Sequence, residues 1–250
     1  MSLIKAFNIK NKDIITIVGA GGKTSLMFSA SSLLRKDYKV LVTTTTHIYV
    51  PDEKLYDKMI MLSDIKDDNY ENIMKENKNG VYVIGSSIVR KSGTKKSKIK
   101  GLNTQMLDKI VPYFDIVIIE GDGSKEKPLK GWRDDEPVIY DKTTKTIGVV
   151  DISSIGLDIN EDNIHRLDKF LNIINDDKGK KVNVNHIKNL VLNKNGLFKV
   201  CKGEKILFIN KAESINDKRN STLLIKDIKN ENSSYIDKFI YGSIVKNSYK

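Results

Sequence analysis

The stretch "IVGAGGKTSL", residues 17–26, joins a run of apolar residues to a helix-like segment through three glycines. A strand, a glycine turn and a helix N-terminus in this order direct free backbone N–H groups and the positive end of the helix dipole at one point, where an anion is stabilised. Lys23 adds an ammonium group for phosphates, and Thr24 adds a hydroxyl for Mg²⁺. We therefore expect a nucleotide-phosphate loop rather than a glycine turn that only caps a helix. Its residues are Gly19, Ala20, Gly21, Gly22, Lys23, Thr24 and Ser25.

The loop is shorter than the commonest phosphate loop. In the pattern G-x-x-x-x-G-K-[ST] the first glycine would stand at position 17, which is Ile17 in this chain. What remains is G-x-x-G-K-T, which resembles the ATP loop of the Mur and folylpolyglutamate ligases. The departure is therefore compatible with nucleotide binding, and both ATP and GTP stay open as the cofactor.

Hydrophobic runs of strand length alternate with helix-like segments along the chain. Several runs are continuous in Val and Ile, which is typical of a sheet covered on both faces. Helical periodicity appears in 23–35 and again in 164–174. This alternation predicts an α/β fold, a three-layer, doubly wound and mainly parallel sheet of the P-loop NTPase type. We expect one domain, 1–250, with residues from about 151 as a candidate C-terminal lobe. The predicted strands are 13–19, 39–45, 58–62, 80–85, 114–121, 146–151, 205–210 and 238–245.

The composition, 39% apolar and 30% charged, is ordinary for a soluble globular protein. No apolar run approaches the roughly 20 residues that cross a bilayer, and the N-terminus lacks a secretory apolar segment. We therefore expect a cytoplasmic protein with no membrane partner. The single cysteine, Cys201, excludes an intramolecular disulfide and a thiolate metal cluster.

The net charge of +11 favours anionic partners, and its densest cluster lies in residues 90–100. No aromatic residue lies within the cluster to stack on bases, so it predicts a solvated loop better than a nucleic-acid surface. The cluster consists of Arg90, Lys91, Lys95, Lys96, Lys98 and Lys100.

Two acidic residues follow the most apolar of the predicted strands. Four consecutive β-branched residues, 116–119, deliver Glu120 to the carboxyl end of the strand, and Asp122 follows two residues later. Ligands of an open parallel sheet bind outside these ends, so Glu120 is a candidate Mg²⁺ ligand beside Thr24. Asp122 is either a second ligand or a general base.

Two polar segments supply further candidates. The stretch "KEKPLKGWRDDEPV", 125–138, is a poor helix and a poor strand, so it is a surface loop or an active-site loop. In the second case Lys125 or Lys130 neutralises a transferring phosphoryl group or binds an acidic substrate. In "TTTTHI", 43–48, His47 is a candidate for substrate binding or proton transfer.

The stretch "NKAE", 210–213, follows a predicted strand and resembles the guanine-reading element of GTPases. It makes Asn210, Lys211 and Glu213 candidates for contact with a base, although Glu213 is one methylene longer than the usual Asp. His165 and Arg166 on the predicted helix are expected to be surface or core residues, and so is His186.

Four stretches, in their order and separations, resemble the YqeC family: "VGAGGKTS", "TTTTHI", "EGDGSKEKPLKGW" with "EPV", and "NKAE". Members of that family are described as accessory or maturation proteins for selenium-dependent molybdenum hydroxylases. The resemblance implies that the glycines and Lys23-Thr24 bind nucleotide phosphates. It also implies a signature loop that holds Glu120, Asp122, Gly123, Lys125, Pro128, Leu129 and Lys130.

The residues and the resemblance together predict a Mg²⁺-dependent NTPase or ligase-like enzyme that acts in this maturation. Lys23 would act on the phosphates, Thr24, Glu120 and Asp122 are the candidates for Mg²⁺, and the acceptor side would hold the residues Asp122, Lys125, Lys130 and His47. The expected partners are a nucleoside triphosphate and a molybdenum hydroxylase or its cofactor. The alternative is a nucleotide-gated chaperone that delivers a cofactor without chemistry of its own.

Overall fold

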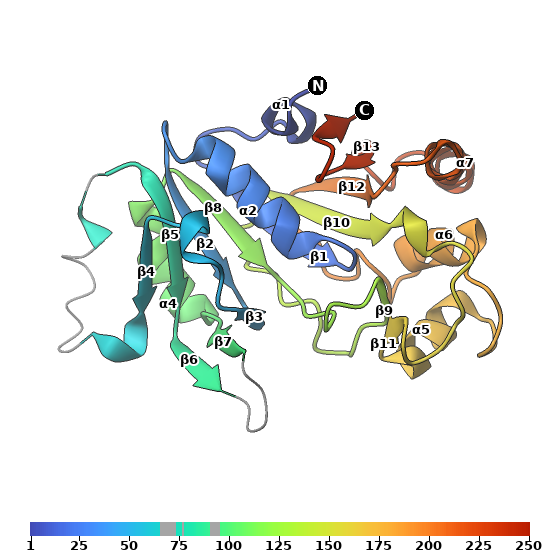
Figure 1. Ribbon diagram of the computed structural model, residues 1–250, viewed down its shortest axis with the longest axis horizontal. Helices are drawn as coiled ribbons and strands as arrows, with labels where there is room; N and C mark the ends of the chain where they lie inside the picture. Colours follow the sequence, from blue (N-terminus) through green and yellow to red (C-terminus); the bar gives the residue numbers. More distant parts are fainter. Residues whose placement is uncertain (66–73, 77, 91–95) are drawn as a thin grey trace.

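The computed structural model describes residues 1–65, 74–76, 78–90 and 96–250, which form an α/β fold around one large sheet (Figure 1). In this part of the chain the sheet has nine strands in the order β14-β13-β12-β10-β1-β8-β2-β5-β4, all parallel to their neighbours except β14. The strands are β1 (Ile14–Gly19), β2 (Lys39–Thr44), β4 (Lys58–Met61), β5 (Gly80–Gly85), β8 (Ile116–Glu120), β10 (Lys145–Asp151), β12 (Glu204–Asn210), β13 (Lys238–Ser243) and β14 (Ser248–Tyr249). The predicted fold is confirmed, and the eight predicted strands match β1, β2, β4, β5, β8, β10, β12 and β13.

Helices cover both faces of the sheet and make three layers. Successive residues of a strand point to opposite faces of the sheet. Ile118 of β8 belongs to the same core cluster as Leu26 of α2, whereas Ile119 belongs to the cluster that contains Leu107 of α4. On the second face α5, α6 and α7 cover the half of the sheet that contains β10 and β12. The helices are α1 (Leu3–Phe7), α2 (Lys23–Leu34), α4 (Thr104–Ile110), α5 (Leu167–Ile174), α6 (Val184–Leu192) and α7 (Ile215–Glu231). Four 3-10 turns are described: Glu53–Leu55, Leu62–Asp64, Val111–Tyr113 and Ile152–Ser154.

Strand β1 lies between the two halves of the sheet. It pairs with β8 on one side, where Ile17 is opposite Glu120, and with β10 on the other, where Gly19 is opposite Val149. The loop after β1 therefore emerges beside the carboxyl ends of β8 and β10. In a doubly wound sheet this is the place where ligands bind.

Two small sheets lie at the same end of the large sheet (Figure 1). One is antiparallel and consists of β3 (His47–Tyr49), β7 (Ser97–Lys100) and β6 (Ser87–Arg90). The other pairs β9 (Leu129–Lys130) with β11 (Ile164–His165) in parallel. Both bring residues that are distant in the sequence to the ends of β1 and β8.

The predicted helix 164–174 is wrong at its start. Ile164 belongs to β11, and the helix begins only at Leu167, because Arg166 between them has a left-handed backbone with φ 58°. The buried face of α5 consequently includes Phe170 and Ile173, which the periodicity did not select, while Leu171 is only half-buried. In the part of the chain that is described, none of the helices combines the length and the apolar character that a membrane span requires.

Candidate phosphate-binding cleft

The loop between β1 and α2 presents backbone N–H groups to a cleft. Among the described residues, no acceptor is found for the N–H groups of residues 21–25, and Gly22 at the N-cap provides no side-chain cap. Helix α2 begins at Lys23, so its dipole adds positive potential at the same point. The predicted phosphate loop therefore has the free donors that bind an anion.

Two glycines of the loop are required by their neighbours. Gly21 has φ +81°, and a Cβ atom there would lie 2.3 Å from Cβ of Asp151. Gly22 has φ +133°, and its Cβ would lie 2.3 Å from Nδ2 of Asn210. The amide of Asn210 donates to the Gly21 carbonyl at 2.8 Å, so β12 braces the loop from the side.

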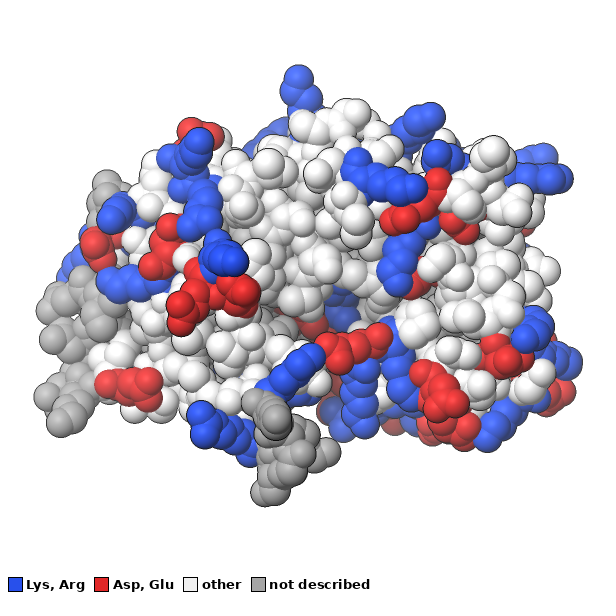
Figure 2. All heavy atoms as spheres, in the orientation of Figure 1, with Lys and Arg blue, Asp and Glu red and all other residues white. Residues whose placement is uncertain are grey.

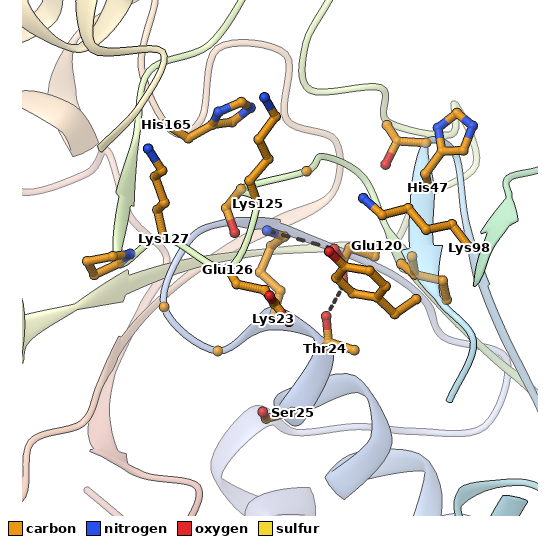
Figure 3. Close-up of a pocket in the computed structure, with 18 of the residues that line it drawn as sticks. Lys23, Thr24, Ser25, His47, Lys98, Glu120, Lys125, Glu126, Lys127 and His165 are labelled. Carbon is orange, nitrogen blue, oxygen red and sulfur yellow. Dashed lines mark hydrogen bonds and ion pairs between the residues drawn. The ribbon is translucent and has the colours of Figure 1, made fainter. Parts of the chain in front are cut away.

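Lys23 is buried against two acidic residues. Its Nζ donates to the Gly19 carbonyl at 2.6 Å and lies 3.4 Å from Asp122 and 3.9 Å from Glu120. The Thr24 hydroxyl donates to Oε2 of Glu120 at 2.6 Å (Figure 3). The predicted lysine, threonine and glutamate are thus brought together at the floor of the cleft.

The two acids differ in their electrostatics. Burial raises the pKa of Glu120 above its usual range, because Lys23 and Thr24 offset the desolvation only in part. Burial would also raise the pKa of Asp122, but Lys130, Lys23 and the Gly19 N–H stabilise its charge and lower the pKa below the ordinary value. Asp122 is therefore a fixed anion, whereas Glu120 is the more easily neutralised group.

Asp122 lies beneath the cleft in a closed polar network. Its carboxylate accepts from the Gly19 N–H at 3.1 Å, from Lys130 Nζ at 2.9 Å and from Trp132 Nε1 at 2.7 Å. Lys130 also donates to Glu136 at 3.3 Å, and burial lowers its pKa. Asp122 and Lys130 are absent from the described residues that line the cleft. Both side chains therefore lie behind the predicted phosphate loop.

Above this floor the cleft has a volume of about 1280 Å³. Figure 2 shows it as a hollow near the middle of one face, with Lys and Arg side chains beside acidic ones at its lower edge. Of the predicted acceptor-side residues, Lys125 and His47 line it. Lys98, Lys127 and His165 join them, although the sequence patterns assigned none of the three to the site (Figure 3).

Histidine 165 reaches the cleft through the short pairing of β9 with β11. Burial is the main cause that lowers its pKa to about 4, and the charges of Arg166, Lys130, Lys125 and Lys127 add to it. His47 is exposed, and its pKa is also lowered, by partial burial and by the lysines of β7. Both rings lie in a positive potential. His186, by contrast, completes the N-terminal capping box of α6. This structural role agrees with the prediction that His186 is not a site residue.

The residues of "NKAE" have separate positions. Asn210 braces the phosphate loop, and Lys211 lines the cleft with its Nζ 2.5 Å from Asp151. Glu213 accepts from the Ser243 hydroxyl at 2.7 Å and is absent from the described cleft lining. Asp151 was missed in the sequence, although an acid at the end of the apolar run 146–151 is the same signal that singled out Glu120.

The basic cluster 90–100 is described only in part, because Lys91 and Lys95 lie outside the described residues. Lys96 and Lys98 line the cleft, and their Nζ atoms lie 5.1 and 4.5 Å from the ring centre of Tyr49. The basic cluster contains no aromatic residue of its own, but Tyr49 of β3 provides an aromatic ring beside two of its lysines.

The oxygen donors at the floor fit Mg²⁺ that is shared with a phosphate. Within the described part of the chain, no group of three or more His, Cys, Asp or Glu side chains is arranged to hold a metal ion alone. Mg²⁺ bound to a nucleotide needs only one or two protein ligands, since water and phosphate oxygens complete its shell. The Thr24 hydroxyl and the Glu120 carboxylate are hard oxygen donors of this kind, in contact with each other.

Comparison with known proteins finds a family that matches this chain. A family model described as "YqeC protein" matches residues 15–168, which include the predicted phosphate loop, Glu120 and both small sheets. A protein of Escherichia coli (strain K12) described as "Uncharacterized protein YqeC" is 28% identical over 217 residues, which cover 81% of this chain and 77% of that protein. The match of the family model ends before Asn210.

Proposed function

The chain belongs to the YqeC family, and from this premise we propose that it is a Mg²⁺-dependent nucleoside-triphosphate-binding protein and an NTPase or ligase-like enzyme. The observation that supports this most strongly is the combination at the end of β1. Loop N–H groups without an acceptor among the described residues, the Lys23 ammonium and the Thr24–Glu120 pair all lie at the floor of the cleft. A turn that only caps a helix does not require a buried lysine and a threonine–glutamate pair, whereas a phosphate site with Mg²⁺ does.

In this proposal each group at the floor has one task. The loop N–H groups and Lys23 bind the phosphates, and Lys23 exchanges its contact with the Gly19 carbonyl for one with a phosphate oxygen. Thr24 and Glu120 hold Mg²⁺, which when bound neutralises charge on the phosphates as a Lewis acid. Asp122 orients Lys23 from behind through the ion pair at 3.4 Å.

We assign Asp122 and Lys130 positioning roles in place of the acceptor-side roles expected from the sequence. A residue at the acceptor side must touch the second substrate, but the side chains of both residues are 0% exposed and are bonded to each other at 2.9 Å. Lys125 and His47 line the cleft and stay candidates for the acceptor side.

The role in maturation of selenium-dependent molybdenum hydroxylases comes from the resemblance of the chain to its family, and we propose it on that basis. Two measurements test the function. Hydrolysis of ATP and GTP with Mg²⁺ by the purified protein distinguishes an enzyme from a nucleotide-gated delivery protein, which would bind without turnover. Hydroxylase activity in cells that carry wild type or Lys23→Ala tests the role in maturation, and equal activity in both would contradict it.

A further inference from the structure

The charges that line the cleft are not balanced. Five carboxylates line it within the described residues, and each has a partner. Glu120, Glu136 and Asp151 are paired with Thr24, Arg166 and Lys211. Glu126 and Asp135 lie 3.8 and 3.1 Å from nitrogens of Lys96 and Arg133. The acidic side chains are therefore already satisfied by the protein.

Three lysines of the lining have no carboxylate partner among the described residues: Lys98, Lys125 and Lys127. They come from different elements, since Lys98 lies on β7 and the other two lie in the loop between β8 and β9. Figure 3 shows them around the opening above Lys23 and Thr24, with His165 between Lys127 and Lys125 and with His47 beside Lys98. The fold thus gathers three lysines that lack a carboxylate partner among the described residues on one wall of the cleft.

We propose that this wall binds a second, phosphate-bearing small-molecule substrate through Lys98, Lys125 and Lys127. The inference rests on the proposed function, in which the loop after β1 holds the nucleotide. There the N–H groups, Lys23 and Mg²⁺ hold the triphosphate at the floor of the cleft, so the wall lysines are available for a second anion.

The size of the cleft supports a second ligand. Pockets for one small molecule typically occupy about 300–1,000 Å³, and this cleft has about 1280 Å³. The backbone also holds the lysine loop in an uncommon shape, because Lys125 and Glu126 both have left-handed φ angles, 52° and 63°. These two residues are the centre of a β-turn that the Lys127 N–H closes on the Ser124 carbonyl at 3.1 Å, so Lys125 and Lys127 are held on one turn.

The cations that are left for a ligand fit a phosphate. Arginine presents a flat fork that matches carboxylate and phosphate through two parallel contacts, whereas lysine binds phosphate as a point charge. The arginines of the lining, Arg133 and Arg166, both contact Glu136. The side chains left for a ligand are lysines, together with two histidines in a positive potential.

Calorimetric titration with inorganic phosphate tests the inference, using protein loaded with Mg²⁺ and a non-hydrolysable nucleoside triphosphate. We expect wild type to bind phosphate, and the triple variant K98Q/K125Q/K127Q to bind it at least tenfold more weakly. The control K36Q/K218Q/K226Q removes the same charge from exposed lysines outside the cleft and is expected to keep the wild-type affinity. Circular dichroism melts verify that both variants are folded.

Equal phosphate affinity in wild type and K98Q/K125Q/K127Q would overturn the inference, and so would a loss of the same size in the control. Succinate that binds as tightly as phosphate would overturn the assignment to phosphate. The same titrations on nucleotide-free Lys23→Ala protein, with and without the three wall substitutions, test the wall even if no nucleotide binds. A failure of the proposed function is therefore distinguishable from a failure of the inference.

Discussion

The Thr24 hydroxyl and Oε2 of Glu120 lie 2.6 Å apart, although 96 residues separate them in the chain. The contact exists because β1 pairs with β8, which places Glu120 opposite Ile17 and next to the loop that leads into α2. The first turn of the helix and the end of a buried strand thus meet beside the loop N–H groups, for which the described residues provide no acceptor. Substitutions in this arrangement, or in the groups that support it, are therefore expected to have distinct effects on binding and stability.

Glu120→Gln is expected to weaken Mg²⁺-nucleotide binding about tenfold, or ~1.4 kcal/mol, and to leave the affinity measured in EDTA nearly unchanged. The amide oxygen can still accept from Thr24, but the charge that holds Mg²⁺ is gone. Calorimetry with and without Mg²⁺ measures both affinities. Glu126→Gln, which removes an exposed carboxylate of the same cleft, is the control. An equal loss with and without Mg²⁺ would refute the metal-binding role of Glu120.

Gly21→Ala is expected to destabilise the protein by about 1–3 kcal/mol, the usual cost of a strained backbone, and to weaken nucleotide binding. The new Cβ would collide with Asp151, and the φ of +81° is unfavourable for alanine. Gly123→Ala is the matched control, because a Cβ there meets nothing within 4 Å. Urea unfolding measures the free energies, and equal effects of the two substitutions would contradict the loop geometry.

Asp122→Asn is expected to cost about 3 kcal/mol or more of unfolding free energy, because it leaves Lys23 and Lys130 buried without their strongest partner. The double variant with Lys130→Met should be destabilised less than the sum of the single variants, as expected for coupled residues. Glu161→Gln, which breaks an exposed ion pair with Lys178, should cost less than about 1 kcal/mol. If Asp122→Asn proved as mild as this control, the network would not position Lys23.

Asn210→Ala is expected to weaken ATP and GTP binding by the same factor. The Asn210 amide donates to the Gly21 carbonyl and so supports the predicted phosphate loop. Its loss should therefore weaken the contacts to the phosphates, which ATP and GTP share, and not the contacts to the base. Glu213→Ala should leave the ratio of the two affinities within about twofold, since its carboxylate bonds to Ser243. Competition binding with both nucleotides measures the ratios. A marked change of base preference in either variant would restore the guanine-reading role.

His165 is expected to make stability depend on pH. Its pKa is lowered from 6.5 to about 4 in the folded chain, so between these values the unfolded chain binds a proton that the folded chain does not. The free energy of unfolding should therefore fall as the pH is lowered from about 6.5 to about 4. His165→Gln should lose less stability than wild type between pH 7 and pH 5 in urea titrations. An NMR titration of the His165 ring with its midpoint near 6.5 would contradict this.

The sequence was sufficient for the parts of the fold that are local or periodic. Continuous Val and Ile runs located the strands, and the glycines with Lys23 located the loop after β1. The order of strands is a tertiary property. The rule that ligands bind at the carboxyl ends of parallel strands nevertheless predicted that Glu120 lies close to Thr24, and the structure places it beside Lys23 and Thr24. The proximity of these three residues therefore follows from the strand pattern and that rule together.

The remaining residues of the cleft depend on contacts that the sequence does not encode locally. His165 lies at the cleft because the two-residue strand β11 pairs with β9, and a strand this short has no periodic pattern in the sequence. Lys98 lies there because β7 pairs in antiparallel fashion with β3. Asp122 and Lys130 carried a clear sequence signal, but burial beneath the loop is a consequence of packing against Trp132 and Glu136. Composition and spacing alone do not distinguish a residue in a cleft from one behind it.

The central claim is that the loop 19–25 binds nucleotide phosphates through Lys23. Calorimetry of Mg²⁺-ATP and Mg²⁺-GTP with wild type, Lys23→Ala and the exposed-lysine control Lys36→Ala tests it most directly. We predict that wild type and Lys36→Ala bind at least one of the nucleotides with equal affinity, and that Lys23→Ala binds it at least tenfold more weakly. Absence of binding by wild type, or equal affinity of wild type and Lys23→Ala, would contradict the claim.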